Sequence, residues 1–215
     1  MVLTSHDTFG TTGRPTGFWL EELTVPLRAF RDAGLAVDLT SVRGGRPPID
    51  PASATDADAA SDADLDALLA GTVPLSSVDP AGYDAVFLVG GHGTMWDFPD
   101  DEHLARLVSA IGRSGVVAAV CHGAVGLLGA TTSTGDPLVA GRTVTGFSDA
   151  EEALAGATAA LPFSLEQRLK ALGATVEVGE PFTPTVRRDG LLLTGQNPAS
   201  SAGVADAVID ALTLR

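Results

Sequence analysis

The run Val116-Val-Ala-Ala-Val120 is the feature that most limits what this chain can fold into. Five consecutive apolar residues leave no polar face, so a strand of this sequence must be covered on both sides. A second run, Tyr83-Asp-Ala-Val-Phe-Leu-Val89, is nearly as apolar, and the segment Glu102–Ile111 between them has helical spacing. Apolar strands that alternate with helices predict an α/β fold, with a parallel sheet covered by helices on both faces.

The rest of the chain extends the same alternation. All 215 residues fit one domain, residues 1–215, which is long enough to bury a complete core. An acidic, proline-containing segment at about 46–80 is interpreted as a surface excursion. The remaining expected elements are strands at Val2–Thr4, Leu35–Val42, Thr143–Thr145, Thr175–Val178, Thr185–Arg188 and Leu191–Thr194, and helices at Leu20–Phe30, His122–Leu128 and Ala199–Leu212.

Charge and composition exclude several classes of partner. The chain has 13 basic and 27 acidic residues, a net charge of −14, whereas nucleic acids and anionic membranes are bound by basic surfaces. No run approaches the roughly 20 apolar residues of a membrane-spanning helix. The first residues, Met1–Asp7, do not resemble a secretory signal, so a cytoplasmic location is expected.

Two of the predicted strands end in unusual sequence. One ends in Gly90-Gly91-His92-Gly93, and the other in Cys121-His122-Gly123. A strand, a nucleophile-capable residue, a glycine two places later and a helix form the pattern of a nucleophile elbow. In open α/β sheets, ligands bind beyond the carboxyl ends of the strands, where both segments are expected. Cys121 is the only cysteine, which excludes an intrachain disulfide; a lone cysteine is otherwise usually a small buried hydrophobe.

The elbow predicts a reactive sulfur at Cys121. A helix N-terminus behind the turn favours the thiolate, so we expect the thiol pKa to lie below the roughly 8.5 of free cysteine. The backbone N–H groups of Gly91 and His122 are candidates for an oxyanion hole.

Two other candidates remain ambiguous from the residues alone. His92 either faces the site or only hydrogen-bonds its own loop. Glu22 lies four residues before Pro26, which lacks the N–H that the Glu22 carbonyl would bind, so the helix is expected to bend there. A carboxylate at such a bend either points inward or is solvated. His6 and His103 are interpreted as surface residues.

Several motifs together resemble a known family. They are Thr16-Gly-Phe-Trp-Leu-Glu-Glu22 followed by Pro26, the segment 84–97, Ala118-Ala-Val-Cys-His-Gly123, Thr145-Gly-Phe-Ser-Asp149 ahead of Glu152, and Leu193-Thr-Gly-Gln-Asn-Pro-Ala-Ser-Ser201. In this order they resemble the ThiJ/PfpI superfamily, which has a class I glutamine amidotransferase-like fold. Within it they are similar to the branch of heat-shock-type chaperones and glutathione-independent glyoxalase III.

The resemblance implies a flavodoxin-like three-layer α/β/α sandwich, a homodimer and a set of site residues. Cys121 would be the nucleophile, His122 its partner, Glu152 the acid and Glu22 a hydrogen-bond partner of the thiol. Gly90, Gly91 and His92 would bind substrate or an oxyanion. A shift of one residue would replace Glu152 by Glu151, but aligning Gly146-Phe-Ser-Asp149 with the family's similar run selects Glu152.

The implied activity is that of a cofactor-independent lyase or hydro-lyase that acts on a small reactive carbonyl, such as methylglyoxal converted to lactate. The alternatives are a holdase chaperone or carbonyl-stress protein, and a member recruited to another hydrolytic or biosynthetic step. The larger chaperones' N-terminal extension and most of their metal ligands have no counterpart here, so no metal is expected. No histidine follows His122, which argues against the glutaminase chemistry of the amidotransferases. No dinucleotide-binding fingerprint is found, so no cofactor is expected.

Overall fold

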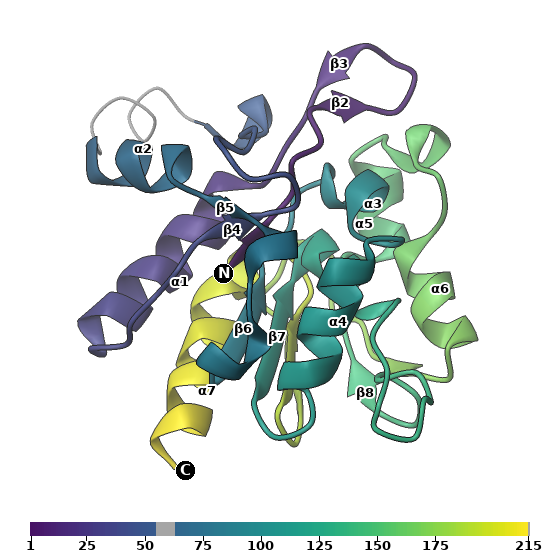
Figure 1. The fold of residues 1–215 in the computed structure, drawn as a ribbon. Coiled ribbons are helices and arrows are strands. Elements are labelled where there is room, and N and C mark those ends of the chain that lie inside the picture. The colour runs from purple at the N-terminus through teal and green to yellow at the C-terminus, as the bar shows by residue number, and fades with distance from the viewer. Residues whose placement is uncertain (55–62, 215) are drawn as a thin grey trace.

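The computed structural model describes residues 1–54 and 63–214, and a seven-stranded sheet lies at its centre (Figure 1). The strand order is β10-β11-β7-β6-β1-β4-β5, and every pair is parallel except β10–β11. The strands are β1 (Val2–Leu3), β4 (Thr40–Ser41), β5 (Val73–Pro74), β6 (Ala85–Leu88), β7 (Val116–Val120), β10 (Val186–Asp189) and β11 (Leu192–Gly195).

Helices cover both faces of this sheet. Helices α1 (Leu20–Asp32) and α7 (Ser201–Thr213) pack against each other on one face, and α4 (Glu102–Ile111) lies on the other (Figure 1). Two buried apolar clusters fill the two interfaces, and β7 is buried along its whole length, as its apolar sequence requires. The prediction of a three-layer α/β/α sandwich with a mostly parallel sheet is therefore confirmed.

Shorter elements complete the fold. The helices are α2 (Ala63–Ala70), α3 (Thr94–Asp97), α5 (Asp149–Leu154) and α6 (Leu165–Ala171), and two small sheets pair β2 (Thr8–Phe9) with β3 (Arg14–Pro15) and β8 (Thr143–Val144) with β9 (Thr175–Val176). Short 3-10 turns are η1 (Pro51–Ser53), η2 (Leu75–Ser77), η3 (Pro80–Gly82), η4 (Cys121–Leu127), η5 (Thr158–Ala160) and η6 (Pro198–Ser200).

The acidic segment at about 46–80 is more than a surface excursion. Its strand β5 forms the edge of the central sheet, and Leu69 and Leu75 are each only 1% exposed. These leucines anchor the segment in the two apolar clusters despite the surrounding acids and prolines. Residues 55–62, which carry part of the acidic run, lie outside the described residues.

Other elements differ from expectation in length or type. The strand expected over Leu35–Val42 is reduced to β4, and the helix expected after Cys121 is the 3-10 turn η4. Gly123 and Gly126 lie three residues apart, the spacing that stacks side chains on one face of a 3-10 helix. A side chain at either glycine would contact Leu88 of β6, so η4 lies very close to that strand.

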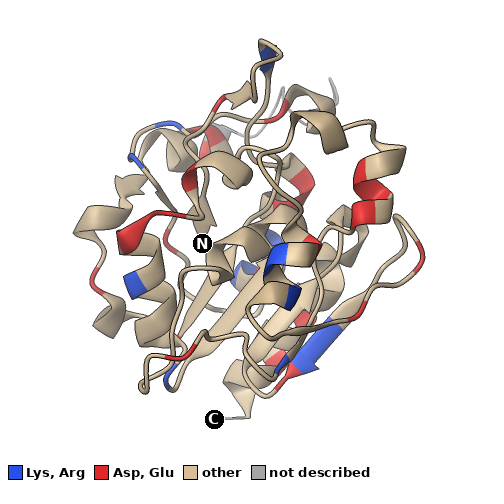
Figure 2. Ribbon diagram, turned by 90° about the vertical axis from the view of Figure 1, so that its right-hand side faces the viewer, with Lys and Arg blue, Asp and Glu red and all other residues tan. Residues whose placement is uncertain are grey.

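Acidic residues are distributed over the helices and loops of the ribbon, with the fewer basic residues between them (Figure 2). No helix in the described part of the chain is both long and apolar enough to span a membrane.

The close approach of η4 to β6 predicts a large effect of Gly123→Ala on stability. A Cβ at Gly123 would lie 2.2 Å from the backbone oxygen of Leu88, which cannot move without distorting the sheet. Overpacking of this kind costs about 1–3 kcal/mol or more. A Cβ at Gly82 would have no neighbour within 4 Å, so Gly82→Ala is the matched control. Urea denaturation should show a lower midpoint for Gly123→Ala alone, and equal midpoints would contradict this packing.

Candidate active site

Cys121 lies at a sharp turn where β7 ends. Its φ is 56°, a left-handed conformation that residues other than glycine rarely adopt, and its side chain is only 3% exposed. The turn raises the sulfur above the carboxyl edge of the sheet, as in a nucleophile elbow. Strand β6 is paired with β7 in the register Leu88↔Ala119. Gly90 follows Leu88 by two residues and Cys121 follows Ala119 by two, so the two residues lie side by side.

Because Gly90 and Gly91 have no side chains, the backbone and the Glu22 carboxyl group can lie close to the Cys121 sulfur. A Cβ at Gly90 would lie 2.4 Å from the Glu22 Oε2 atom and 3.0 Å from the Cys121 Cβ. Gly91 has a φ of 107°, and a Cβ there would lie 2.5 Å from the Gly17 carbonyl oxygen. Glycine is required at both positions because any side chain would displace groups of the site.

His122 connects the sulfur to a carboxylate. Its Nδ1 atom lies 3.3 Å from the Cys121 Sγ, and its Nε2 atom lies 2.5 Å from Oε1 of Glu152. Burial and the nearby His92 ring lower the pKa of His122, so the ring is neutral. A carboxylate can only accept, so Nε2–H donates to Glu152, and Nδ1 is left with a lone pair facing the thiol.

Glu152 also accepts from a second imidazole. The His92 Nε2 lies 3.2 Å from Oε2 of Glu152, and the His92 and His122 ring centroids are 4.2 Å apart. Burial opposes ionisation of Glu152, but the interactions with His122 and His92 outweigh it and lower its pKa to about 2. His92 therefore belongs to this cluster, and its contacts are not confined to its own loop.

Glu22 is completely buried beside the thiol, on the first turn of α1, which continues unbroken through Pro26. Burial raises the pKa of Glu22 well above its ordinary 4.5, although Cys121 and the Gly90 backbone lie close enough to oppose this. Neither carboxyl oxygen has a well-formed hydrogen bond among the residues that the structure describes. Glu22 is thus a neutral carboxyl group with unoccupied hydrogen-bonding capacity.

The prediction of a lowered thiol pKa at Cys121 is wrong. Burial raises this pKa well above 9.0, and the Glu22 carboxyl raises it further, outweighing the opposing contact with the His122 backbone N–H. The expected effect of a helix N-terminus is small because η4 is a short 3-10 turn, and the groups that act on the thiol pKa include no cationic side chain among the described residues. The thiol is therefore protonated at neutral pH.

Glu151 and Glu152 are adjacent but have separate contacts. Glu151 forms a capping box with Ser148 at the start of α5, and its Oε1 atom accepts from Asn197 Nδ2 and the Phe182 N–H, both at 2.8 Å. Only Glu152 reaches His122. The Ser148–Glu151 spacing is the sequence pattern of a capping box, and it would have assigned Glu151 to the helix start.

Aromatic rings around the histidines were not anticipated. Phe9 of β2 lies 5.0 Å from the His92 ring, and Phe147 lies 4.5 Å from the His122 ring, both measured between centroids. These side chains come from segments far from Cys121 in sequence, so only the fold reveals them. His6, expected at the surface, is half-buried and stacks on Trp96.

The site has the donor set for a divalent metal ion as well. The ligand atoms of His92, His122 and Glu152 all lie within 4.8 Å of one another. Two imidazoles and a carboxylate suit Zn²⁺ or Fe²⁺. An ion held there would take the Nε2 atom with which His122 holds Glu152, so metal binding and the hydrogen-bonded arrangement exclude each other.

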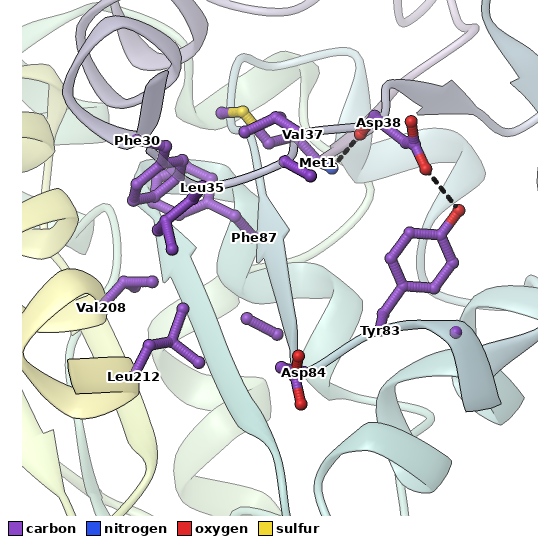
Figure 3. Close-up of a pocket in the computed structure, with 13 residues that line it drawn as sticks. Met1, Phe30, Leu35, Val37, Asp38, Tyr83, Asp84, Phe87, Val208 and Leu212 are labelled. Atoms are coloured by element: carbon purple, nitrogen blue, oxygen red, sulfur yellow. Dashed lines mark hydrogen bonds between the residues drawn. The ribbon is translucent and has the colours of Figure 1, made fainter. Parts of the chain in front are cut away.

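A separate cavity of about 260 Å³ lies at the opposite edge of the sheet (Figure 3). It opens near the start of β1 and β6, where Met1 donates to the Asp38 carbonyl and the Tyr83 hydroxyl donates to the Asp38 carboxylate. None of the cluster around Cys121 lines this cavity.

Comparison with known proteins places this fold and cysteine elbow in a family. The DJ-1/PfpI family pattern matches residues 15–211, and the chain belongs to that family. It is 31% identical to glyoxalase 3 of Candida albicans over 98% of this chain and 96% of that protein. It is 34% identical to the glutathione-independent glyoxalase HSP31 of Saccharomyces cerevisiae over 99% of this chain and 96% of that one. These relatives support an enzymatic role.

Solved structures agree with this assignment. The crystal structure of glyoxalase III from Candida albicans has a TM-score of 0.88 and 30% identity, covering 98% of this chain and 95% of that one. Rapid Encystment Protein 24 KDa of Francisella tularensis has a TM-score of 0.93 and 36% identity, covering 99% and 97%. The expected resemblance to the glyoxalase III branch is confirmed.

The low pKa of Glu152 predicts a specific loss of stability in acid. Its folded pKa of about 2 lies below the ordinary 4.5, so the carboxylate stabilises the fold above pH 4.5. As the pH falls from about 5 to 2, this contribution, on the order of 3 kcal/mol, is lost. Glu152→Gln removes the titration. Denaturant unfolding over this range should show a steeper decline for the wild type; parallel curves would contradict the assignment.

The raised thiol pKa predicts slow alkylation at neutral pH. Cys121 is the only cysteine, so the pH dependence of its reaction with iodoacetamide reports this group alone. The midpoint should lie above 9.0 in the wild type and fall in Glu22→Gln, which removes an ionisable neighbour. Glu21→Gln, at the exposed adjacent position, should match the wild type. A wild-type midpoint near neutrality would refute this description of the site.

Proposed function

We propose that this protein is a glutathione-independent glyoxalase that converts methylglyoxal and related 2-oxoaldehydes into 2-hydroxy acids. The observation that supports this most directly is the arrangement around Cys121: a base on one side of the thiol and a neutral carboxyl group on the other. The names of the relatives point to the same reaction. In this proposal, Cys121, His122, Glu152 and Glu22 are catalytic or positioning residues.

The first step is addition of the sulfur to the aldehyde carbon. The Nδ1 atom of His122 takes the thiol proton, and the Glu152 carboxylate stabilises the resulting imidazolium. His92 holds the second Glu152 oxygen and so fixes the carboxylate. The aldehyde oxygen becomes an oxyanion, which the Gly91 and His122 N–H groups stabilise and Glu22 protonates. The product is a hemithioacetal.

The second step moves hydrogen between the two carbons. Glu22, now a carboxylate, removes the C–H proton from the former aldehyde carbon to form an enediol and returns it to the neighbouring carbon. The hydroxyl proton on the first carbon passes to the second oxygen, which leaves a thioester. Glu22 suits this role better than His122, because both His122 ring nitrogens already have partners.

The last step is hydrolysis. Glu22 takes a proton from the attacking water as its hydroxide adds to the thioester carbon, the hydroxy acid leaves, and the sulfur recovers its proton from His122. One water molecule is consumed in total and no electrons are exchanged with another molecule. The chemistry is therefore that of a lyase or hydro-lyase and balances without a redox cofactor.

Three further parts of the proposal rest on family resemblance and charge: a homodimer, a cytoplasmic location and no binding of nucleic acid. The alternative is a family member recruited to another hydrolytic or biosynthetic step. One observation supports it: the name of the Francisella tularensis relative does not refer to a glyoxalase. A product assay separates the two functions.

Purified protein should form lactate from methylglyoxal without glutathione, metal or nucleotide. Cys121→Ser should abolish conversion, because serine is a much weaker nucleophile with this base. Glu22→Gln should lower kcat at least about 100-fold, the usual contribution of a general acid–base. Chromatographic measurement of lactate gives the rate.

Glu21→Gln is the matched control, since Glu21 is exposed on the same turn of α1, and it should keep wild-type turnover. Lactate formation that survives Cys121→Ser would exclude the covalent route. Absence of lactate from wild-type protein with a reduced thiol would favour the recruited enzyme.

A further inference from the structure

A continuous row of aromatic rings crosses the site. Each ring contacts the next at a centroid distance of 4.2–6.1 Å, and the two histidines of the cluster occupy the middle. One end is half-buried and its ring lies beside the backbone of β2, whereas the other end reaches the surface. In order, the row consists of His6, Trp96, Phe9, His92, His122, Phe147 and Phe182.

Phe182 is the surface end of this row, and its conformation is costly. The residue is 50% exposed, and its φ of 58° is left-handed. Glycine or asparagine would make the same turn with less strain. Strained backbone of this kind persists only where surrounding structure holds it, and it concentrates at ligand sites. A large apolar ring at this strained, left-handed position therefore indicates that the Phe182 side chain has a function.

A buried polar network holds Phe182 in place. The Phe182 N–H donates to Glu151, whose carboxylate also accepts from Asn197. The Asn197 amide in turn donates to the Thr183 carbonyl in the same loop. Glu151 and Asn197 are fully buried, and Pro181 restricts the chain before Phe182. The ring is thus presented from a rigid support beside the site.

We propose that Phe182, together with Phe147, binds the substituent of the 2-oxoaldehyde and makes the site selective for aryl substrates over methylglyoxal. This inference rests on the proposed function. Phe147 contacts the base His122, and Phe182 extends the same apolar wall outward. A substituent attached beside the reacting carbons meets this wall, and an aryl ring gains aromatic contacts that a methyl group is too small to make.

The test compares phenylglyoxal, which gives mandelate, with methylglyoxal, which gives lactate. Phe182→Ala removes the ring but keeps a residue with the same backbone restriction, and Phe182→Tyr keeps the ring. We expect Phe182→Ala to lower the phenylglyoxal/methylglyoxal ratio of kcat/KM about tenfold, equivalent to about 1.4 kcal/mol. Phe182→Tyr should retain the ratio.

Leu154→Ala is the control for removing an exposed apolar side chain; Leu154 is 68% exposed on α5, outside the row, and the ratio should not change. An unchanged ratio in Phe182→Ala would overturn the proposal. Equal losses on both substrates would also overturn it, and a simultaneous change of mass in light scattering would assign Phe182 to a subunit interface.

Failure of the proposed function is distinguished by a binding measurement. If wild-type protein converts neither oxoaldehyde, the glyoxalase assignment is wrong. Calorimetric binding of mandelate and lactate then tests the role of Phe147 and Phe182 without turnover. We then expect wild-type protein to bind mandelate more tightly than lactate, and Phe182→Ala to lose that difference. Equal affinity of the wild type for the two acids would overturn the role of Phe182.

Discussion

The parallel pairing of β6 with β7 is the constraint on which the rest of this site depends. It sets the two strand ends side by side, so that the Gly90 segment and the Cys121 turn share one edge of the sheet. The approach is so close that Gly90 has no room for a Cβ, and neither has Gly123 on the opposite side of the turn. Backbone packing, before any side-chain chemistry, therefore decides where the sulfur lies.

Electrostatics then divides the site into a charged half and a neutral half. Glu152 is ionised because two imidazoles donate to it, whereas Glu22 is kept neutral by burial. Two carboxyl groups of the same chemistry thus have different protonation states on either side of one thiol. The same burial that raises the pKa of Glu22 also raises the pKa of Cys121, so in the proposed reaction the thiol proton has to pass to His122.

Apolar strands and the elbow motif are local signals, so the residues themselves predicted most of the central sheet and the turn at Cys121. Glu22, His92 and Glu152 were assigned to the site only through the resemblance to a family. The thiol pKa could not be predicted, since it depends on complete burial and on a carboxyl group about 100 positions away in the chain. The contribution of residues 46–80 to the sheet edge was obscured by its acids and prolines. The aromatic row depends on tertiary contacts between β2, the segment before α5 and the Phe182 loop, and no local pattern marks it.

Because Glu151 and Glu152 are adjacent at the start of α5, two properties of the site depend on the same stretch of backbone. Glu152 accepts a hydrogen bond from His122, the proposed base, and Glu151 accepts one from the backbone N–H of Phe182. Insertion or deletion of a single residue between Ser148 and Glu151 would rotate both carboxylates about the helix axis by roughly 100°. Loop grafting aimed at this region would therefore lose the His122 contact and the support of Phe182 together. Substitutions within the 181–184 loop leave the helix register intact, which makes that loop the safer place to alter the proposed selectivity.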